Sequence, residues 1–391
     1  MRIREIEIKG LFGMFYHKIP LNLNSHLTII YGENGIGKTM IFKLLDWLFN
    51  ISLANLTNIQ KSSFTELSIF FETNSILKII NIAGKIKIIY VNEEGKEREI
   101  SIYAMSSNGN IIPIFHGIST VIKNSNLYFI QTQRLLYVTG DFEGHSFFED
   151  TATQYAKELS KNIKEKTYQY RKLSDDLKNS LSQRILSKNV KIDYDITELQ
   201  ALAQEVDTKR KQLQAVGLME KIAENFHIPN DIDELGKAIL AVNIQDMQTQ
   251  LKIYEEDNFY QRLKLFIEIL NERRLSYKKI TLSEIEGFSF TNDNNIPLKP
   301  NDLSSGEQHE LVLLYQLLFK IPSNALILLD EPEISLHITW QKEFIDDMND
   351  IIKLRNFDVL LATHSPSIIN GNWDLTVSLT GRNHEEQKQP A

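Results

Sequence analysis

Residues 32–39 read GENGIGKT, a glycine-rich segment between a short apolar run, Leu27–Tyr31, and a longer one, Met40–Phe49. The first run has the length of a strand buried on both faces, and the second has the length of a helix. Glycine allows tight backbone turns that residues with a Cβ make only with strain. The segment fits the pattern G-x-x-x-x-G-K-S/T, in which backbone N–H groups and a helix N-terminus surround phosphate groups. The sequence therefore predicts an α/β fold in which a phosphate-binding loop follows one strand of a sheet.

The residues of this loop have separate expected roles. Lys38 is expected to reach the β- and γ-phosphates, and the hydroxyl of Thr39 is expected to ligate Mg²⁺. The other residues would direct their backbone N–H groups at the phosphates. The residues expected to bind the nucleotide are Gly32, Glu33, Asn34, Gly35, Ile36, Gly37, Lys38, Thr39 and Met40.

A second strand ends in two acidic residues. Residues 326–331 read LILLDE, and an apolar run of this kind is typical of a buried strand. Such a strand does not end in adjacent carboxylates unless a cation or water meets them. We expect Asp330 to hold Mg²⁺ through a water, and Glu331 to be the general base that activates the attacking water. The alternative is a solvated strand end followed by an acidic turn.

A third strand, Asp358–Ala362, ends in the residues THSP. Ligands in open α/β sheets bind at the carboxyl ends of the strands, so His364 is expected to contact the γ-phosphate. The alternative is an ordinary surface residue, which is the commoner role of a lone histidine after a strand.

The motifs GENGIGKT, LSSGEQ, LILLDEPE and THS, in that order, resemble the head of an ABC-type ATPase of the SMC, RecF and overcoming-lysogenization-defect (OLD) branch. Leu303–Gln308 resembles the ABC signature, and Glu333–His337 resembles the D-loop. The resemblance implies that the signature of one subunit completes the nucleotide site of another. The signature residues expected to do so are Ser304, Ser305, Gly306 and Glu307.

The segment FIQTQRLL, Phe129–Leu136, lies where this family carries its Q-loop. Either Gln131 or Gln133 takes the role that faces Mg²⁺ and the attacking water. Gln133, next to Arg134, is the preferred candidate for this catalytic and metal-supporting role.

The resemblance implies an α/β fold, an ABC-type P-loop ATPase head with a mixed sheet and a helical-hairpin insertion. The expected parts are residues 1–150 (the N-terminal part of the head), 151–280 (the insertion) and 281–391 (the C-terminal part). The insertion is predicted from apolar residues at helical spacing, without a sustained heptad. Its expected helices are Thr151–Leu186, Asp195–Val216 and Asp231–Arg274.

The wording of the motifs and the chain length of 391 residues are similar to the short ATPase subunits of bacterial phage-defence systems such as Septu, PARIS and retrons. This resemblance implies an ATPase that binds ATP and Mg²⁺, dimerises head-to-tail around ATP, and controls a separate effector such as a nuclease or toxin. A phage protein is the expected trigger. The chain lacks the cysteine hook and the nuclease domain of larger relatives.

Two rival functions are a DNA-repair or chromosome clamp and the nucleotide subunit of a membrane transporter. The net charge is −8, which argues against general coating of DNA. Residues 151–290 contain 22 basic and 22 acidic residues, and the best basic patch there is Arg273, Arg274, Lys278 and Lys279. A solvated helix end is the alternative interpretation of this patch. No run is long enough to span a membrane and the N-terminus predicts a strand, so a cytoplasmic protein is expected.

Overall fold

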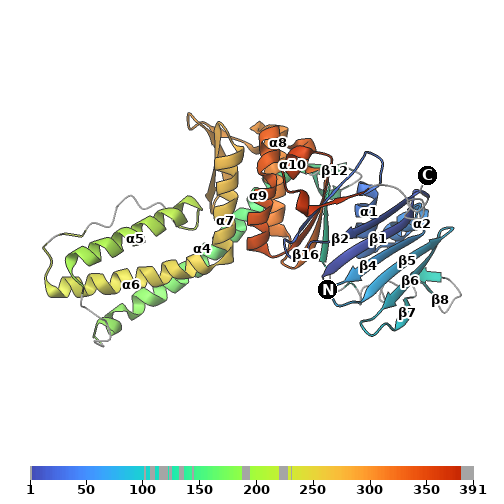
Figure 1. Cartoon of the computed structure of the whole chain (residues 1–391). Coiled ribbons are helices and arrows are strands. Elements are labelled where there is room, and N and C mark those ends of the chain that lie inside the picture. The colour runs from blue at the N-terminus through green and yellow to red at the C-terminus, as the bar shows by residue number, and fades with distance from the viewer. Residues whose placement is uncertain are drawn as a thin grey trace. The chain divides into compact units, whose positions relative to one another are not determined.

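The computed structural model describes residues 2–100, 103–105, 111–113, 122, 126–131, 136–142, 145–186, 194–219, 228–229 and 231–379. The chain forms two compact units (Figure 1). The first consists of Met1–Arg134 and Phe319–Ala391, and the second of Leu135–Leu318.

The first unit contains a five-stranded parallel sheet in the order β10-β16-β17-β3-β18. Its register pairs Asp330, the last residue of β16, with Ala362, and pairs Thr363, the last residue of β17, with Tyr31. The segments that follow β3, β16 and β17 therefore leave the sheet at one edge, as the sequence predicts. The strands are β3 (Leu27–Tyr31), β10 (Asn126–Ile130), β16 (Ala325–Asp330), β17 (Asp358–Thr363) and β18 (Thr376–Ser378).

The same unit contains a six-stranded antiparallel sheet in the order β2-β1-β4-β5-β6-β7. At the turn between β5 and β6, Ala83 and Gly84 have φ angles of 51° and 82°, as two-residue hairpins require. The predicted α/β fold with parallel and antiparallel strands is confirmed. The strands are β1 (Ile3–Leu11), β2 (Phe15–Pro20), β4 (Glu66–Phe71), β5 (Ile76–Ile82), β6 (Lys85–Val91) and β7 (Glu97–Ile100), with a separate pair, β8 (Tyr103–Met105) and β9 (Ile111–Pro113).

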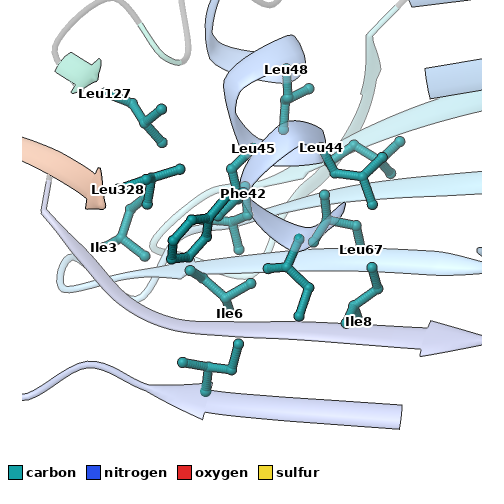
Figure 2. Packing of buried hydrophobic residues seen from close by; sticks show 14 of the residues in the cluster. Ile3, Ile6, Ile8, Phe42, Leu44, Leu45, Leu48, Leu67, Leu127 and Leu328 are labelled. Carbon is teal, nitrogen blue, oxygen red and sulfur yellow. The ribbon is translucent and has the colours of Figure 1, made fainter. Parts of the chain in front are cut away.

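Helix α1 (Lys38–Phe49) supplies apolar side chains to a core that both sheets share. Figure 2 shows Phe42 of α1 among Ile6 of β1 and Leu328 of β16, and all three belong to one buried cluster. Burial of each such side chain contributes roughly 1.5–3 kcal/mol. Apolar packing therefore fixes the helix whose N-terminus forms part of the phosphate-binding loop.

Further helices of the first unit lie within the described residues. Helix α2 (Leu53–Lys61) begins after Ser52, whose side chain accepts a hydrogen bond from the N–H of Asn55 (3.1 Å). Such a cap fixes the start of a helix. In the described part of the chain, no helix has the length and apolar character needed to cross a membrane. The helices with described bounds are α2 (Leu53–Lys61), η4 (Pro332–Ser335), α9 (Ile338–Arg355), α10 (Pro366–Ile369) and η5 (Trp373–Leu375).

The second unit contains the predicted long helices. Helix α4 covers Thr151–Leu186 and α5 covers Ile196–Ala215. The expected helix Asp231–Arg274 is interrupted at Asp257, whose carboxylate accepts a hydrogen bond from the N–H of Phe259 (2.6 Å) and begins a new helix. The interrupted segment forms α6 (Glu234–Glu256), α7 (Asn258–Glu268) and the π-helical turn η1 (Ile269–Arg274).

Strands and a further helix belong to this second unit. Strands β13 and β14 form an antiparallel hairpin that β15 extends, and β11 pairs with β12. Helix α8 continues into η3, which ends just inside the first unit. These elements are β11 (Leu136–Phe142), β12 (His145–Asp150), β13 (Lys278–Ser283), β14 (Gly287–Asn292), β15 (Pro297–Leu298), η2 (Pro300–Asp302), α8 (Ser305–Tyr315) and η3 (Gln316–Lys320).

The division between the units differs from the expected boundaries at residues 150 and 281. Gly287 of β14 lies against α4 so closely that a Cβ there would be 1.8 Å from the carbonyl oxygen of Ala156. The rings of Tyr155 in α4 and Tyr315 in α8 stack with centroids 4.3 Å apart. These contacts place residues 281–318 in the same unit as helices α4 to α7. The sequence instead predicts that they belong with residues 319–391.

The candidate basic patch is largely neutralised within the second unit. Arg274 is buried and its Nε lies 3.9 Å from the carboxylate of Glu310. Arg273 pairs with Glu268 (3.3 Å), and Lys278 pairs with Glu307 (2.7 Å). Neither a basic patch nor a solvated helix end therefore describes these residues, because carboxylates of the same unit face Arg273, Arg274 and Lys278; of the four, only Lys279 is exposed.

Candidate functional site

The glycine-rich loop joins the end of β3 to the start of α1. Gly37, the last residue before the helix, has φ 103°, and a Cβ there would lie 2.4 Å from Cδ2 of Leu11. Backbone geometry and space therefore both demand glycine. Ile41 donates its N–H to the carbonyl of Gly37 (2.9 Å), so the N–H groups of the preceding turn point out of the helix end, toward any anion held by the loop.

Lys38 lies across this loop, with only 4% of the residue exposed. Its Nζ donates to the carbonyl oxygens of Gly32 (2.8 Å) and Glu33 (3.2 Å). The pKa of Lys38 lies below its ordinary value because the side chain is buried. The nearby carboxylates of Glu331 and Asp330 offset part of this lowering. The ammonium group is thus held by neutral carbonyl acceptors, which a phosphate oxygen can replace with a stronger, charge-assisted hydrogen bond.

Asp330 and Thr39 meet although they are far apart in sequence. Asp330 is 7% exposed, and this burial raises the pKa of its carboxyl above the ordinary value. A hydrogen bond from the side chain of Thr39 offsets part of the increase. A hydroxyl and a carboxylate are both hard oxygen ligands that suit Mg²⁺. Among the described residues, no three His, Asp or Glu side chains are arranged to hold a metal. This pair therefore fits a cation whose remaining ligands are phosphate and water oxygens.

Glu331 has a strained backbone at the end of β16. Its φ and ψ are 43° and 58°, a left-handed conformation that costs a residue with a side chain of order 1–3 kcal/mol. Its N–H donates to the carbonyl of Ala362 on the neighbouring strand (2.9 Å), which holds this conformation. The strain turns the carboxylate out of the strand toward the loop that follows β17.

His364 connects Glu331 with Lys38. Its Nε2 lies 3.1 Å from Oε1 of Glu331, and its Nδ1 lies 3.3 Å from Nζ of Lys38. An ammonium group only donates, so Nδ1 accepts and Nε2 carries the proton that it donates to the carboxylate. The structure thus brings together Lys38, Glu331 and His364 in one hydrogen-bonded chain, and places Asp330 and Thr39 beside it.

Glu333 is a residue of this region whose contacts the sequence does not reveal. One of its carboxylate oxygens accepts hydrogen bonds from the Thr363 hydroxyl (2.6 Å) and from the N–H groups of His364 (2.7 Å) and Ser365 (3.2 Å). It therefore fixes the backbone that carries His364. The only sequence signal is that Glu333 is the third acidic residue of DEPE, and the resemblance to a D-loop already accounts for it.

A pocket of about 640 Å³ opens beside the phosphate-binding loop. Gly32, Glu33 and Ile36 of the loop line it, together with His364 and Trp373. The aromatic ring of Trp373 lies edge-on to that of Tyr31, with centroids 5.7 Å apart. The loop is therefore open to solvent on the side that faces His364.

The other expected site residues lie elsewhere. Gln133 lies outside the described residues, whereas Gln131 is exposed directly after β10. Ser304, Ser305, Gly306 and Glu307 lie at the start of α8 in the second unit. There the Ser304 hydroxyl accepts a hydrogen bond from the N–H of Glu307 (3.3 Å), and the Glu307 carboxylate accepts one from the N–H of Ser304 (2.7 Å). This reciprocal cap fixes the helix start.

Comparison with known proteins places this geometry in context. A family profile described as "AAA ATPase domain" matches residues 1–369. The chain is similar to the "Retron Ec83 probable ATPase" of Escherichia coli, with 22% identity over 405 residues, covering 94% of this chain and 69% of that protein. It is also similar to a "Probable iron chelatin transport ATP-binding protein" of Helicobacter pylori, with 38% identity over 69 residues, covering 18% of this chain and 26% of that protein.

Among solved structures, the chain resembles the Smc head domain with an extended coiled coil from Pyrococcus furiosus. The sequence identity is 15% and the TM-score 0.41, over 97% of this chain and 94% of that one. The predicted similarity to ATPases that include retron subunits is confirmed by the family profile and by the Escherichia coli relative.

Proposed function

We propose that this chain, which belongs to the AAA ATPase domain family, hydrolyses ATP with Mg²⁺ and uses the reaction to control a separate effector protein. The observation that carries the proposal is the hydrogen-bonded chain Lys38–His364–Glu331 beside the phosphate-binding loop. Phosphoryl transfer to water uses a cation that binds the phosphates and a residue that orients the attacking water, and the ammonium group of Lys38 and the carboxylate of Glu331 support the proposal because they suit these roles.

Phosphate binding would use the loop and Lys38. The N–H groups at the start of α1 would donate to phosphate oxygens, and Lys38 would exchange its neutral carbonyl acceptors for a charged one. Thr39 and Asp330 are the residues that would hold Mg²⁺. When bound, the metal ion neutralises charge that develops on the β- and γ-phosphate oxygens.

Water activation would fall to Glu331. A carboxylate that accepts a proton from the attacking water typically contributes 10²–10⁴-fold to such a reaction. His364 donates to this carboxylate and accepts from Lys38, so a γ-phosphate that draws Lys38 away would also change the contacts of His364. This link supports a role for His364 in reporting the γ-phosphate to Glu331. A role for Gln131 or Gln133 in supporting the metal and water rests only on the resemblance of Phe129–Leu136 to a Q-loop.

The signature residues would act on a second copy of the chain. Ser305 and Gly306 form the first turn of α8, and the start of a helix offers N–H donors to phosphate. In the proposed head-to-tail dimer, these residues close the site of the partner copy. ATP would then stabilise the closed pair and hydrolysis would release it, which is a switch driven by γ-phosphate contacts.

The effector role rests on similarity over nearly the full chain. The relative that covers 94% of this chain is named as the probable ATPase of a retron. We propose that the chain senses a phage protein and restrains or releases a nuclease or toxin in anti-phage defence. The DNA-clamp alternative predicts accessible basic residues, and the ion pairs of Arg273, Arg274 and Lys278 oppose it.

A mixing experiment tests the shared active site. Lys38→Ala is expected not to bind ATP, and Ser305→Arg is expected to bind one ATP per chain but hydrolyse it poorly. A 1:1 mixture should recover about one quarter of the wild-type rate, since half of the pairs are mixed and each mixed pair keeps one intact site. Normal hydrolysis by Ser305→Arg alone, or no recovery on mixing, would contradict the dimer. Ser276→Arg, at an exposed serine of the same unit, is the control.

The effector role is tested by expressing the chain with the product of its neighbouring gene. We expect the two proteins to co-purify, and the pair to lower phage plating efficiency unless Lys38 is replaced by alanine. Salt-dependent binding of duplex DNA by the purified chain, without a partner protein, would favour the clamp instead.

A further inference from the structure

His17 is a buried polar side chain that the proposed reaction does not use. It lies on β2, and only 2% of the residue is exposed. Its ring stacks on that of Phe15, with centroids 5.8 Å apart and planes 24° apart. Its Nε2 lies 2.9 Å from the carbonyl oxygen of Ile36, which is the residue before the last glycine of the phosphate-binding loop.

The direction of this hydrogen bond is fixed by the chemistry of its acceptor. A carbonyl oxygen only accepts, so Nε2 of His17 must carry a hydrogen. Burial lowers the pKa of His17, which favours the neutral ring near pH 7. The neutral side chain therefore donates one hydrogen bond, from Nε2 to the carbonyl oxygen of Ile36.

The peptide that follows this carbonyl is constrained as a consequence. No cis peptide bond occurs among the described residues, and in a planar trans peptide the C=O and the following N–H point in opposite directions. A donor that holds the Ile36 carbonyl therefore turns the N–H of Gly37 away from His17. With φ 103° and no Cβ, Gly37 has the backbone freedom to flip this peptide if nothing holds it.

We propose that His17 is a positioning residue of the phosphate-binding loop: it holds the Ile36 carbonyl outward and so points the Gly37 N–H at the phosphates of the bound nucleotide. This inference rests on the proposed nucleotide site and adds a residue from β2 to its support. Without the donor, the flipped peptide would present a carbonyl oxygen, a partial negative charge, to an anion. A fixed dipole that needs no rearrangement stabilises charge better than a mobile one.

The competing explanation is that His17 only fills space between β2 and the loop. Glutamine and methionine separate the two, because both are unbranched and of similar size while only glutamine donates a hydrogen bond. The amide nitrogen of glutamine also lies at a similar distance from the backbone to Nε2 of histidine. The matched pair His17→Gln and His17→Met therefore changes the donor and keeps most of the volume.

The experiment is calorimetric titration of the full chain with Mg²⁺-ATP, ADP and adenosine. For His17→Met we expect ATP and ADP to bind on the order of tenfold more weakly, as for the loss of one phosphate-directed donor. His17→Gln should bind both nucleotides within about threefold of the wild type, and adenosine should bind all three proteins alike. Equal losses in both variants, or no loss in either, would overturn the proposal.

A second measurement uses the unaltered chain, so it does not depend on the variants folding. Nitrogen-15 shifts of the histidine rings should show His17 as the Nε2–H tautomer at neutral pH. The Nδ1–H tautomer would overturn the proposal. If the wild type itself binds no ATP, the proposed function fails; if it binds ATP and His17→Met binds equally well, only the role of His17 fails.

Discussion

Two buried cations, Lys38 in the first unit and Arg274 in the second, are held by different kinds of partner. In the first, the ammonium group of Lys38 hydrogen-bonds to two backbone carbonyls and to Nδ1 of His364. In the second, buried Arg274 lies beside the carboxylate of buried Glu310, and Asp257 accepts hydrogen bonds from Lys166 (2.8 Å) and Tyr170 (2.7 Å). Neutral acceptors are readily exchanged for a charged ligand, whereas opposite charges are not.

Backbone strain is a second feature of the region around Lys38. Glu331 carries a left-handed backbone in the first unit, although a carboxylate side chain gains nothing for folding from that conformation. Such outliers persist where the surrounding structure over-determines them, and they gather at sites of chemistry. We infer that the region around Lys38 and Glu331 gives up stability for exchangeable contacts, while the pair Arg274–Glu310 stabilises the fold of the second unit.

Replacement of Glu331 tests the reactive side of this comparison most strongly. Glu331→Gln keeps the shape of the side chain but removes the base, so the rate of ATP hydrolysis should fall by roughly 10²–10⁴-fold. ATP binding should persist, and light scattering should show a dimer that no longer dissociates. Glu93→Gln, at an exposed turn, is the control. Normal turnover in Glu331→Gln would remove Glu331 from its role.

The charged pair of the second unit should show its effect in stability. Arg274→Leu leaves Glu310 buried without its cation, and we expect the free energy of unfolding to fall by about 3–5 kcal/mol in urea titrations. The double variant Arg274→Leu, Glu310→Leu should recover most of this loss, because the buried charge is gone. A double variant as unstable as the single one would show that the pair is not what stabilises this region.

Lys38→Met is the matched test in the first unit. Since Lys38 has exchangeable acceptors, its loss should change the free energy of unfolding by less than about 1 kcal/mol. A loss as large as that of Arg274→Leu would contradict the comparison between the units.

Glu333 should affect catalysis more than binding. Glu333→Ala removes the acceptor that fixes Thr363, His364 and Ser365, and supporting residues of this kind typically contribute 10–100-fold to activity. We expect kcat to fall by that order while the Kd for ATP changes by less than about threefold. Glu333→Gln keeps one carboxamide oxygen as an acceptor and should recover part of the rate. An unchanged kcat in Glu333→Ala would show that the backbone of His364 holds itself.

The features that could be predicted from sequence depend on short stretches of chain. The strand Leu27–Tyr31, the loop that follows it and the acids after β16 are local patterns, and parallel pairing brings the strand ends to one edge. The contacts of Glu333 and His17 depend instead on which segments lie side by side in three dimensions. The same is true of Arg274, which follows another arginine in the sequence but whose partner, Glu310, lies on another helix.

The break in the expected helix Asp231–Arg274 shows a second limit. Asp257 lies inside a pattern of helical spacing, and nothing in that spacing separates an interior aspartate from a cap. The hydrogen bonds from Lys166 and Tyr170 of α4 fix its carboxylate at the junction of α6 and α7. Tertiary contacts therefore decide a boundary that local propensity leaves open.

The smallest expected effect is a pH dependence of folding at His17. Burial lowers the pKa of His17 below its ordinary value of 6.5, so between these two values the unfolded chain binds more protons than the folded one. The contribution of the neutral ring is therefore complete above pH 6.5 and is lost as the pH falls through the folded pKa. We expect the free energy of unfolding of the wild type to fall more than that of His17→Gln between neutral and mildly acidic pH, as urea titrations at each pH would show. If the free energies of unfolding of the two proteins changed equally with pH over this range, His17 would be protonated as easily in the folded chain as in the unfolded one. The ring would then not be the neutral donor that the loop requires.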